Sequence, residues 1–240
     1  MKRKLLTAML PIVLLLATCK KTSKPYWAID PVIKKSYAFK TGSYWVYKER
    51  YTGAIDSCYV WTSSDGTSET PDDTHEEFRN EVRMINDIAG HIEEWDFAMD
   101  GAVANSGIGL SFYNNQDKIE DQLHNLGLFT SHIQVDSQDT TECEVMSGLH
   151  NGVYRLITKI ESIYNSYNVD GINYANVVQI HYWSEHDPYS TSTSISNPSI
   201  KFDDYVFMSP NIGIVKIIFN HPQDTIYREL DLLRYKTITY

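Results

Sequence analysis

The chain has 240 residues, with 31 acidic and 21 basic side chains and a formal net charge of −10. An acidic protein repels the phosphates of nucleic acids, and no stripe of lysine and arginine runs along this sequence, which argues against nucleic acid as a partner. The 17 tyrosines and 5 tryptophans are typical of β-rich exported proteins, in which aromatic side chains cover pleated surfaces.

Residues 1–18 carry the pattern of a secretory signal peptide. Three basic residues, Lys2 to Lys4, precede an apolar run from Leu5 to Leu16, and the sequence Leu-Ala-Thr-Cys at 16–19 resembles the lipobox of bacterial lipoproteins. The run of about 12 apolar residues is shorter than the roughly 20 that a membrane-spanning helix needs. We therefore expect cleavage before Cys19, acylation of Cys19 with palmitate-type chains, and attachment to the membrane through this lipid anchor.

Residues 19–36 are expected to form a lipidated tether, followed by a single β-rich domain at 37–240. Lysines recur between residues 20 and 35, interrupted by Pro25 and Pro31, and basic side chains are attracted to anionic headgroups. No acidic cluster follows Cys19. This favours an outer-membrane lipoprotein of the cell envelope that faces the periplasm, with display on the cell surface as the alternative.

From Tyr37 onward, apolar and polar residues mostly alternate, as expected of β-strands that bury one face. Turn signals separate the alternating segments, among them Thr52-Gly53, Asp170-Gly171 and Ser209 to Gly213. A polar segment at 63–74 is predicted to be a loop. The predicted strands are residues 44–51, 57–61, 78–85, 92–99, 108–113, 153–164, 172–183, 201–208, 214–219 and 225–239.

Two segments have helical features. Thr74 and Glu77 match a capping box, so a helix is the alternative to a strand for residues 78–85. Residues 117–126 are predicted as a short helix, because apolar residues recur there at i, i+4 and i+7 and Gly127 follows. The predicted fold class is therefore mainly β: a curved antiparallel sheet or half-open barrel with one short helix.

Cys58 and Cys143 are the only cysteines apart from Cys19. In an oxidising compartment such a pair is a candidate disulfide, and a bridge that closes so long a loop stabilises a fold by roughly 4–5 kcal/mol in the chain-entropy model. Two buried free thiols are the alternative. The sequence leaves both alternatives open.

Three segments together resemble a loose group of uncharacterised lipoproteins of Gram-negative bacteria. They are FKTGSYWVY at residues 39–47, GINYANVV at 171–178 and YVFMSPNIGIVK at 205–216. Such patterns are similar to those of curved antiparallel sheets, including the half-open barrels of lipoprotein carriers. The resemblance implies no activity, cofactor or catalytic residue.

The motifs that would carry catalytic or metal-binding chemistry are incomplete. His75 begins a zincin-like segment, but Arg79 stands where the second histidine must lie. His181, His186 and Asp187 are chemically suited to zinc, yet a histidine at a strand end beside a polar loop is more often a surface residue. We therefore expect no metal site, no cofactor and no enzymatic activity.

The sequence favours a membrane-anchored, non-catalytic module that binds an envelope protein or a glycan. Tyr182, Trp183 and Tyr189 flank a Ser/Thr-rich loop at residues 184–199. Exposed aromatic side chains beside a mobile polar loop are a candidate partner contact. Packing of these rings beneath the loop is the alternative.

Two other functions stand as alternatives to this module. A half-open barrel can carry an apolar ligand or lipid, and a hydrolase of envelope glycans would need convergent carboxylates in a cleft. The interior decides between a solid module and a carrier, because large side chains that fill it leave no room for a ligand. The deciding positions are Val178, Ile180, Tyr182, Ile217 and Phe219.

Overall fold

The computed structural model describes residues 24–85, 94–100, 107–113, 120–121, 128–129, 135–136, 138–146, 151–186, 203–221 and 226–240. Within these residues the chain forms a 14-stranded sheet and one helix. The elements are β1 (Tyr26–Trp27), α2 (Pro31–Tyr37), β2 (Tyr44–Glu49), β3 (Ile55–Glu69), β4 (Thr74–Met84), β5 (Glu94–Asp100), β6 (Gly107–Tyr113), β7 (Glu120–Asp121), β8 (Leu128–Phe129), β9 (Gln138–Met146), β10 (Asn151–Val169), β11 (Ile172–His186), β12 (Asp203–Ser209), β13 (Gly213–His221) and β14 (Ile226–Lys236).

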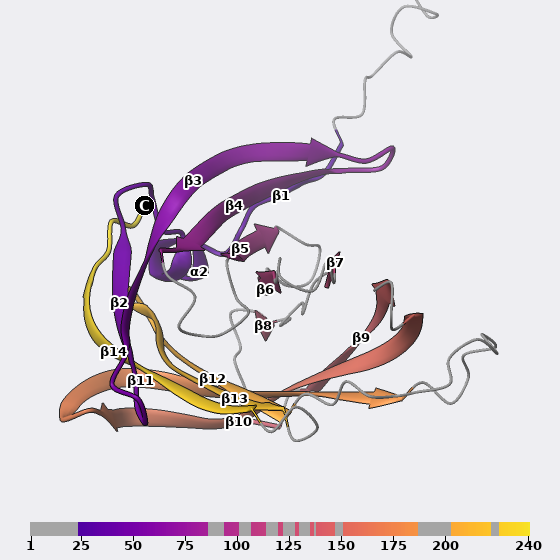
Figure 1. Cartoon of the computed structure of the whole chain (residues 1–240). Coiled ribbons are helices and arrows are strands. Elements are labelled where there is room, and N and C mark those ends of the chain that lie inside the picture. Colours follow the sequence, from indigo (N-terminus) through magenta and orange to yellow (C-terminus); the bar gives the residue numbers. More distant parts are fainter. Residues whose placement is uncertain are drawn as a thin grey trace, which may run out of the picture.

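The strands form one open, curved sheet. Their order is β7-β9-β10-β11-β12-β13-β14-β2-β3-β4-β5-β6-β8, with antiparallel neighbours throughout, and β1 adds to β4 in parallel. Among the described strands, β7 and β8 end this order, and the sheet curves around α2 (Figure 1). This confirms the predicted fold class, which is mainly β with a curved antiparallel sheet and one short helix.

The helix, however, lies in a different segment from the predicted one. Of residues 117–126, only Glu120 and Asp121 are described, and they form β7; the others lie outside the described residues. The alternation in residues 78–85 is confirmed as a strand, because β4 covers all but the last of them. The polar loop predicted at 63–74 is wrong for its first half, because residues 63–69 continue β3. These residues pair with β4, from Ser63 opposite Asn80 to Glu69 opposite Thr74.

Of the expected tether at residues 19–36, the structure describes residues 24–36, which pack on the domain through β1 and α2. Asp30 caps α2 by accepting a hydrogen bond from the backbone of Val32 at 2.7 Å. Ile29, Ile33 and Tyr37 are buried, with exposed fractions of 2–4%. The apolar spacing in a helix of seven residues, about two turns, is too short a signal among lysines and prolines to reveal this docking from sequence.

The core lies on the concave face of the sheet. Trp45 and Tyr47 of β2 are buried, and Phe39 packs edge-on against Trp45 with ring centroids 5.1 Å apart. Gly213, which ends a predicted turn, has φ +92°. In any other residue at this position, the Cβ would lie 3.2 Å from the Phe39 ring. Glycine is therefore required there both for the backbone conformation and for the ring packing.

Large side chains fill the deciding interior positions. All five are buried, with exposed fractions between 0% and 5%: Val178, Ile180, Tyr182, Ile217 and Phe219. The five successive residues from Gly213 to Ile217 are also buried, so β13 is covered on both faces.

The β10–β11 hairpin extends well past its neighbours. β11 pairs with β12 only from Val178 to Trp183, and the part of the hairpin at residues 161–177 is called the arm. Its tip is the predicted turn, where Asp170 and Gly171 have φ values of 46° and 85°.

The arm packs against the sheet rather than projecting freely. The Tyr167 ring stacks on Phe207 with centroids 4.8 Å apart, and the Tyr174 hydroxyl donates to the Leu232 carbonyl at 3.2 Å. These contacts cover the outer face of β12–β14 and bury Phe207 and Tyr174, which thereby join the hydrophobic cluster from that side.

Candidate functional site

The sheet has an outer face, opposite to the core, on which charged and aromatic side chains form rows. Lys216 of β13 opposes Asp231 of β14, which opposes Lys48 of β2. Directly opposed residues of antiparallel strands point to the same face, and the next row, with Ile217 and Leu230, lies in the core. The outer face therefore holds the polar rows.

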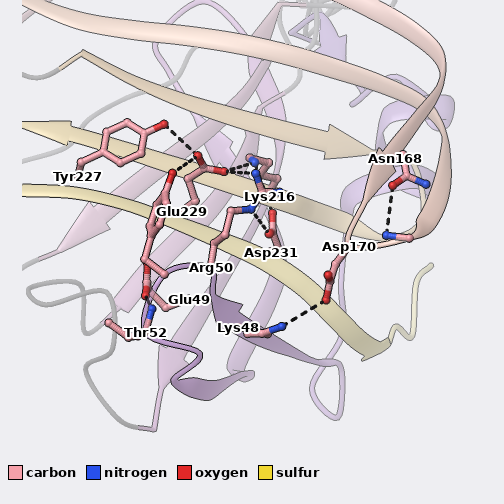
Figure 2. Close-up of polar contacts among 12 residues, drawn as sticks. Lys48, Glu49, Arg50, Thr52, Asn168, Asp170, Lys216, Tyr227, Glu229 and Asp231 are labelled. Carbon is pink, nitrogen blue, oxygen red and sulfur yellow. Dashed lines mark hydrogen bonds and ion pairs between the residues drawn. The ribbon is translucent and has the colours of Figure 1, made fainter.

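Two tyrosines and four charged side chains meet on the outer face in what is called the charged cluster. Its carboxylates come from β14, its lysine from β13 and its arginine from the turn after β2. The members are Arg50, Tyr51, Lys216, Tyr227, Glu229 and Asp231 (Figure 2).

Glu229 lies at the centre of the charged cluster. Its carboxylate accepts hydrogen bonds from Lys216 and, at 2.9 Å each, from the hydroxyls of Tyr51 and Tyr227. Arg50 pairs with Glu229 at 2.8 Å and with Asp231 at 2.8 Å. Lys216 also lies 3.5 Å from Asp231. Two cations thus face two carboxylates, so the cluster is neutral as a whole.

The hydrogen bonds decide the charge of Glu229. Burial by itself would raise the pKa of this carboxyl, but the bonds from Lys216, Tyr51 and Tyr227 outweigh burial and lower the pKa below its ordinary value. Partial burial and the same carboxylate raise the pKa of the Tyr227 hydroxyl. Glu229 therefore stays ionised and its tyrosine partners stay neutral donors at physiological pH.

The charged cluster holds the turn between β2 and β3 against the sheet. Arg50 and Tyr51 belong to this turn, and the Glu49 carboxylate accepts a further hydrogen bond from the backbone of Thr52. Lys48, one residue earlier, lies 3.8 Å from Asp170 at the tip of the arm (Figure 2). The geometry is that of a structural brace in which charged groups satisfy one another.

A second polar group surrounds His181 on β11. The two ring nitrogens lie 3.0 Å from Glu161 and 2.7 Å from Asp203, and the ring stacks on Tyr205 at 4.3 Å and on Trp183 at 4.5 Å. The imidazole of His181 therefore links strands β10 and β12 through their carboxylates.

The partner contact predicted beside loop 184–199 is corrected for one of its residues. Tyr182 is 1% exposed and belongs to the core, because its neighbours His181 and Trp183 point to the outer face and side chains alternate along a strand. Trp183 is half-buried against His181. Residues 184–186, the predicted start of the loop, form the end of β11 instead. Tyr189, the rest of the loop, Asp187 and the side chain of His186 lie outside the described residues.

Exposed aromatic side chains gather instead on the outer face of β2–β4. Tyr44 directly opposes Tyr59, which opposes Arg83, while the neighbouring row with Trp45 and Cys58 is buried. The name aromatic patch is used for Tyr44, Tyr59, Trp61 and Arg83.

Trp61 is the most exposed ring of the aromatic patch. Its exposed fraction is 52%, its ring meets that of Tyr59 edge-on at 6.2 Å, and the Arg83 guanidinium lies over it at 4.6 Å. The register of β3 against β4 shifts between Val60 and Thr62, so Trp61 sits in a β-bulge. Bulges re-aim side chains and are frequent next to functional sites. Sequence reasoning missed this patch, because the alternation of 57–61 does not reveal a bulge.

Cys58 is a free, fully buried thiol, and burial raises its pKa well above the ordinary value. This matches the second alternative, a buried free thiol, at position 58. The side chain of Cys143 lies outside the described residues, and its strand β9 is separated from β3 by six strands in the sheet order. Cys19 also lies outside the described residues, so its acylation remains a prediction.

Within the part of the chain that the structure describes, histidine, cysteine and acidic side chains form no group of three arranged to hold a metal ion. The same residues contain no helix with the length and apolar character that a membrane span requires.

Among solved structures, the chain is similar to a proposed lipoprotein from Parabacteroides distasonis ATCC 8503. The sequences are 14% identical, the match covers 84% of this chain and 99% of that chain, and the TM-score is 0.42. A proposed exported protein with a YmcC-like fold from Bacteroides fragilis NCTC 9343 is 13% identical, with the same coverage and a TM-score of 0.42. No protein-family model and no curated protein matches the chain. Similarities of this size carry no argument about function.

Proposed function

We propose that this protein is an outer-membrane lipoprotein of the cell envelope, anchored through acylated Cys19 and facing the periplasm. Its β domain binds another envelope protein through the aromatic patch and catalyses no reaction. The observation that carries this proposal is the pair of exposed rings of Tyr44 and Trp61, which lie on one sheet face beside the half-buried Tyr59 and Arg83.

The composition of the aromatic patch favours a protein partner. Tryptophan, tyrosine and arginine are the residues that most often dominate the binding energy of protein interfaces. The rings of Tyr59 and Trp61 contact each other, and Arg83 is held over Trp61. Side chains that are already ordered lose little conformational entropy on binding, which favours affinity.

The non-catalytic part of the proposal rests on how the carboxylates of the charged cluster are used. Glu229 and Asp231 both contact cations, and the lowered pKa of Glu229 suits a permanently charged group better than one that exchanges protons near neutral pH. The filled interior at the five deciding positions favours a solid module over a carrier of an apolar ligand.

Site-specific photo-crosslinking in intact cells tests the proposed contact. A photoreactive phenylalanine analogue replaces Trp61, and the control carries it at Tyr240, which is also exposed (43%) but contacts Phe78, Lys34 and Lys40 instead. We expect a discrete protein adduct at position 61 that is absent at position 240.

Three outcomes would contradict the proposal. Adducts of equal yield at both positions would remove the aromatic patch as the contact. Adducts at position 61 that contain envelope glycan and no protein would replace the protein partner with a sugar. Hydrolysis of a glycan or ester by the purified protein would contradict the non-catalytic assignment.

A further inference from the structure

The chain enters the described domain at a fixed place, the turn between β3 and β4. The Lys24 ammonium donates to the Thr70 carbonyl at 2.6 Å and lies 3.8 Å from Glu69. The Pro25 carbonyl accepts from the backbone of Thr74 at 2.9 Å. Lys24 and Pro25 are therefore held at this turn by side-chain and backbone contacts together.

Strand β1 continues the same attachment. Tyr26 and Trp27 pair in parallel with Thr74 and His75 of β4. The turn itself is braced, because the Thr70 backbone donates to the Asp73 carbonyl at 2.9 Å. The N-terminal segment and the β3–β4 turn thus form one rigid unit, called the anchored end, with residues 24–27 and 69–75.

The distance from the anchored end to Cys19 is limited by covalent geometry. Five residue steps separate Cys19 from Lys24, and a fully extended chain spans at most about 3.6 Å per residue, so the separation is at most about 18 Å. Strand β3 alone has 15 residues, which at roughly 3.3 Å per residue is close to 50 Å. The tether is therefore shorter than the domain is long.

We infer that the anchored end rests on the headgroup surface of the bilayer that holds the lipid anchor. This inference relies on the proposed acylation of Cys19. Tyr26 of the anchored end is 56% exposed, as for aromatic side chains at membrane interfaces. Three carboxylates, Glu69, Asp72 and Asp73, against the one lysine Lys24 make this end acidic and suit it to zwitterionic headgroups. Glu69 and Lys24, with side chains 71% and 40% exposed, pair with each other and keep this end out of the hydrocarbon.

The orientation places the aromatic patch at a set height above the membrane. Trp61 lies eight residues before Glu69 on β3, which is roughly 26 Å along a strand. The anchored end and the tip of the arm lie at opposite ends of the molecule (Figure 1). The arm therefore points away from the bilayer, and a partner protein meets the patch from the aqueous side.

Energy transfer in vesicles tests this orientation with the full-length, lipidated protein. A fluorescent unnatural amino acid replaces Asp72 in the β3–β4 turn, and the matched control carries it at Asp170 in the arm tip; both are exposed aspartates in turns. The acceptor is a headgroup-labelled lipid in phosphatidylethanolamine and phosphatidylglycerol vesicles. We expect transfer from position 72 to be several times more efficient than transfer from position 170.

A longer tether sharpens the test. About 20 Gly/Ser residues inserted between Ser23 and Lys24 add an average reach of about 25 Å. We expect this insertion to lower the transfer from position 72 towards that from position 170. Equal transfer from both positions without the insertion, in protein that is bound to vesicles, would overturn the orientation. Vesicle binding that is unchanged by Cys19→Ala would overturn the lipid anchor instead.

Discussion

Tyr44 and Trp45 are neighbours in the chain, yet they belong to regions with different roles. Trp45 is 1% exposed and packs on Phe39 in the core, whereas Tyr44 is 38% exposed on the outer face with Trp61 nearby at 52%. The pleat of β2 sends the two rings to opposite faces. The same type of side chain therefore stabilises the fold on the concave face and remains available for contact on the outer face.

The polar groups on the two faces also differ in how they are paired. The core contains hydroxyl and indole donors that reach single backbone carbonyls, such as Tyr47 to Ile214 at 2.8 Å. Charged groups are buried on both faces: Asp56 and Asp204, which oppose Tyr47 and Tyr182 on the core side, are 1% and 2% exposed. The outer face brings opposite charges into direct contact, with Lys216 and Glu229 both less than 10% exposed. A charge that is buried needs a partner of opposite sign, whereas a buried hydroxyl needs one acceptor. Mutations should consequently have different costs and different pH dependence on the two faces.

Truncation of Trp45 should have the largest effect on stability. Trp45→Ala removes a fully buried ring and its hydrogen bond to the Ile212 carbonyl, and we expect the free energy of unfolding to fall by about 3–5 kcal/mol. Urea unfolding of the Cys19→Ala mature chain measures this. Tyr44→Ala is the matched control on the outer face, and an equal loss in both variants would contradict the division into two faces.

Removal of the buried lysine should have the next largest effect. Lys216→Met leaves Asp231 and Glu229 with Arg50 as their one remaining cation in the charged cluster, so we expect a loss of about 3 kcal/mol. The control is Lys236→Met, at an exposed position on β14. A fully stable Lys216→Met protein would show that the cluster contributes no net stability.

The charged cluster should also make stability depend on pH. Because the pKa of Glu229 is lowered in the folded protein, its contribution is present above the unfolded pKa of roughly 4.3 and is lost as pH falls through the folded value. Glu229→Gln should therefore flatten the fall in unfolding free energy between about pH 5 and pH 3. Parallel pH profiles for the wild type and the variant would reject the assigned direction.

Truncation on the aromatic patch should have the smallest effect on stability. Trp61→Ala removes a ring that is 52% exposed, and surface changes of this kind usually alter the free energy of unfolding by about 0.5 kcal/mol or less. The same variant should weaken capture of the protein partner. Differential scanning calorimetry checks the first effect, and a loss near that of Trp45→Ala would make Trp61 a core residue.

The sequence by itself determined the strands and turns. Alternation placed strands close to β2, β4, β10, β11 and β13, and the glycine turns at Asp170-Gly171 and Ser209 to Gly213 are where the structure has them. Such signals are local, because the pleat repeats every two residues and a turn is set by a few backbone angles. The fold class follows from their number and order.

The tertiary structure alone decided which face each segment meets. The docking of α2 and the bulge at Trp61 both depend on strands that are distant in sequence. The charged cluster shows this most clearly, since Arg50 and Asp231 are 181 residues apart and yet 2.8 Å from each other. No local sequence pattern indicates such a pair, because the two side chains can interact only after the sheet has brought β2 and β14 together.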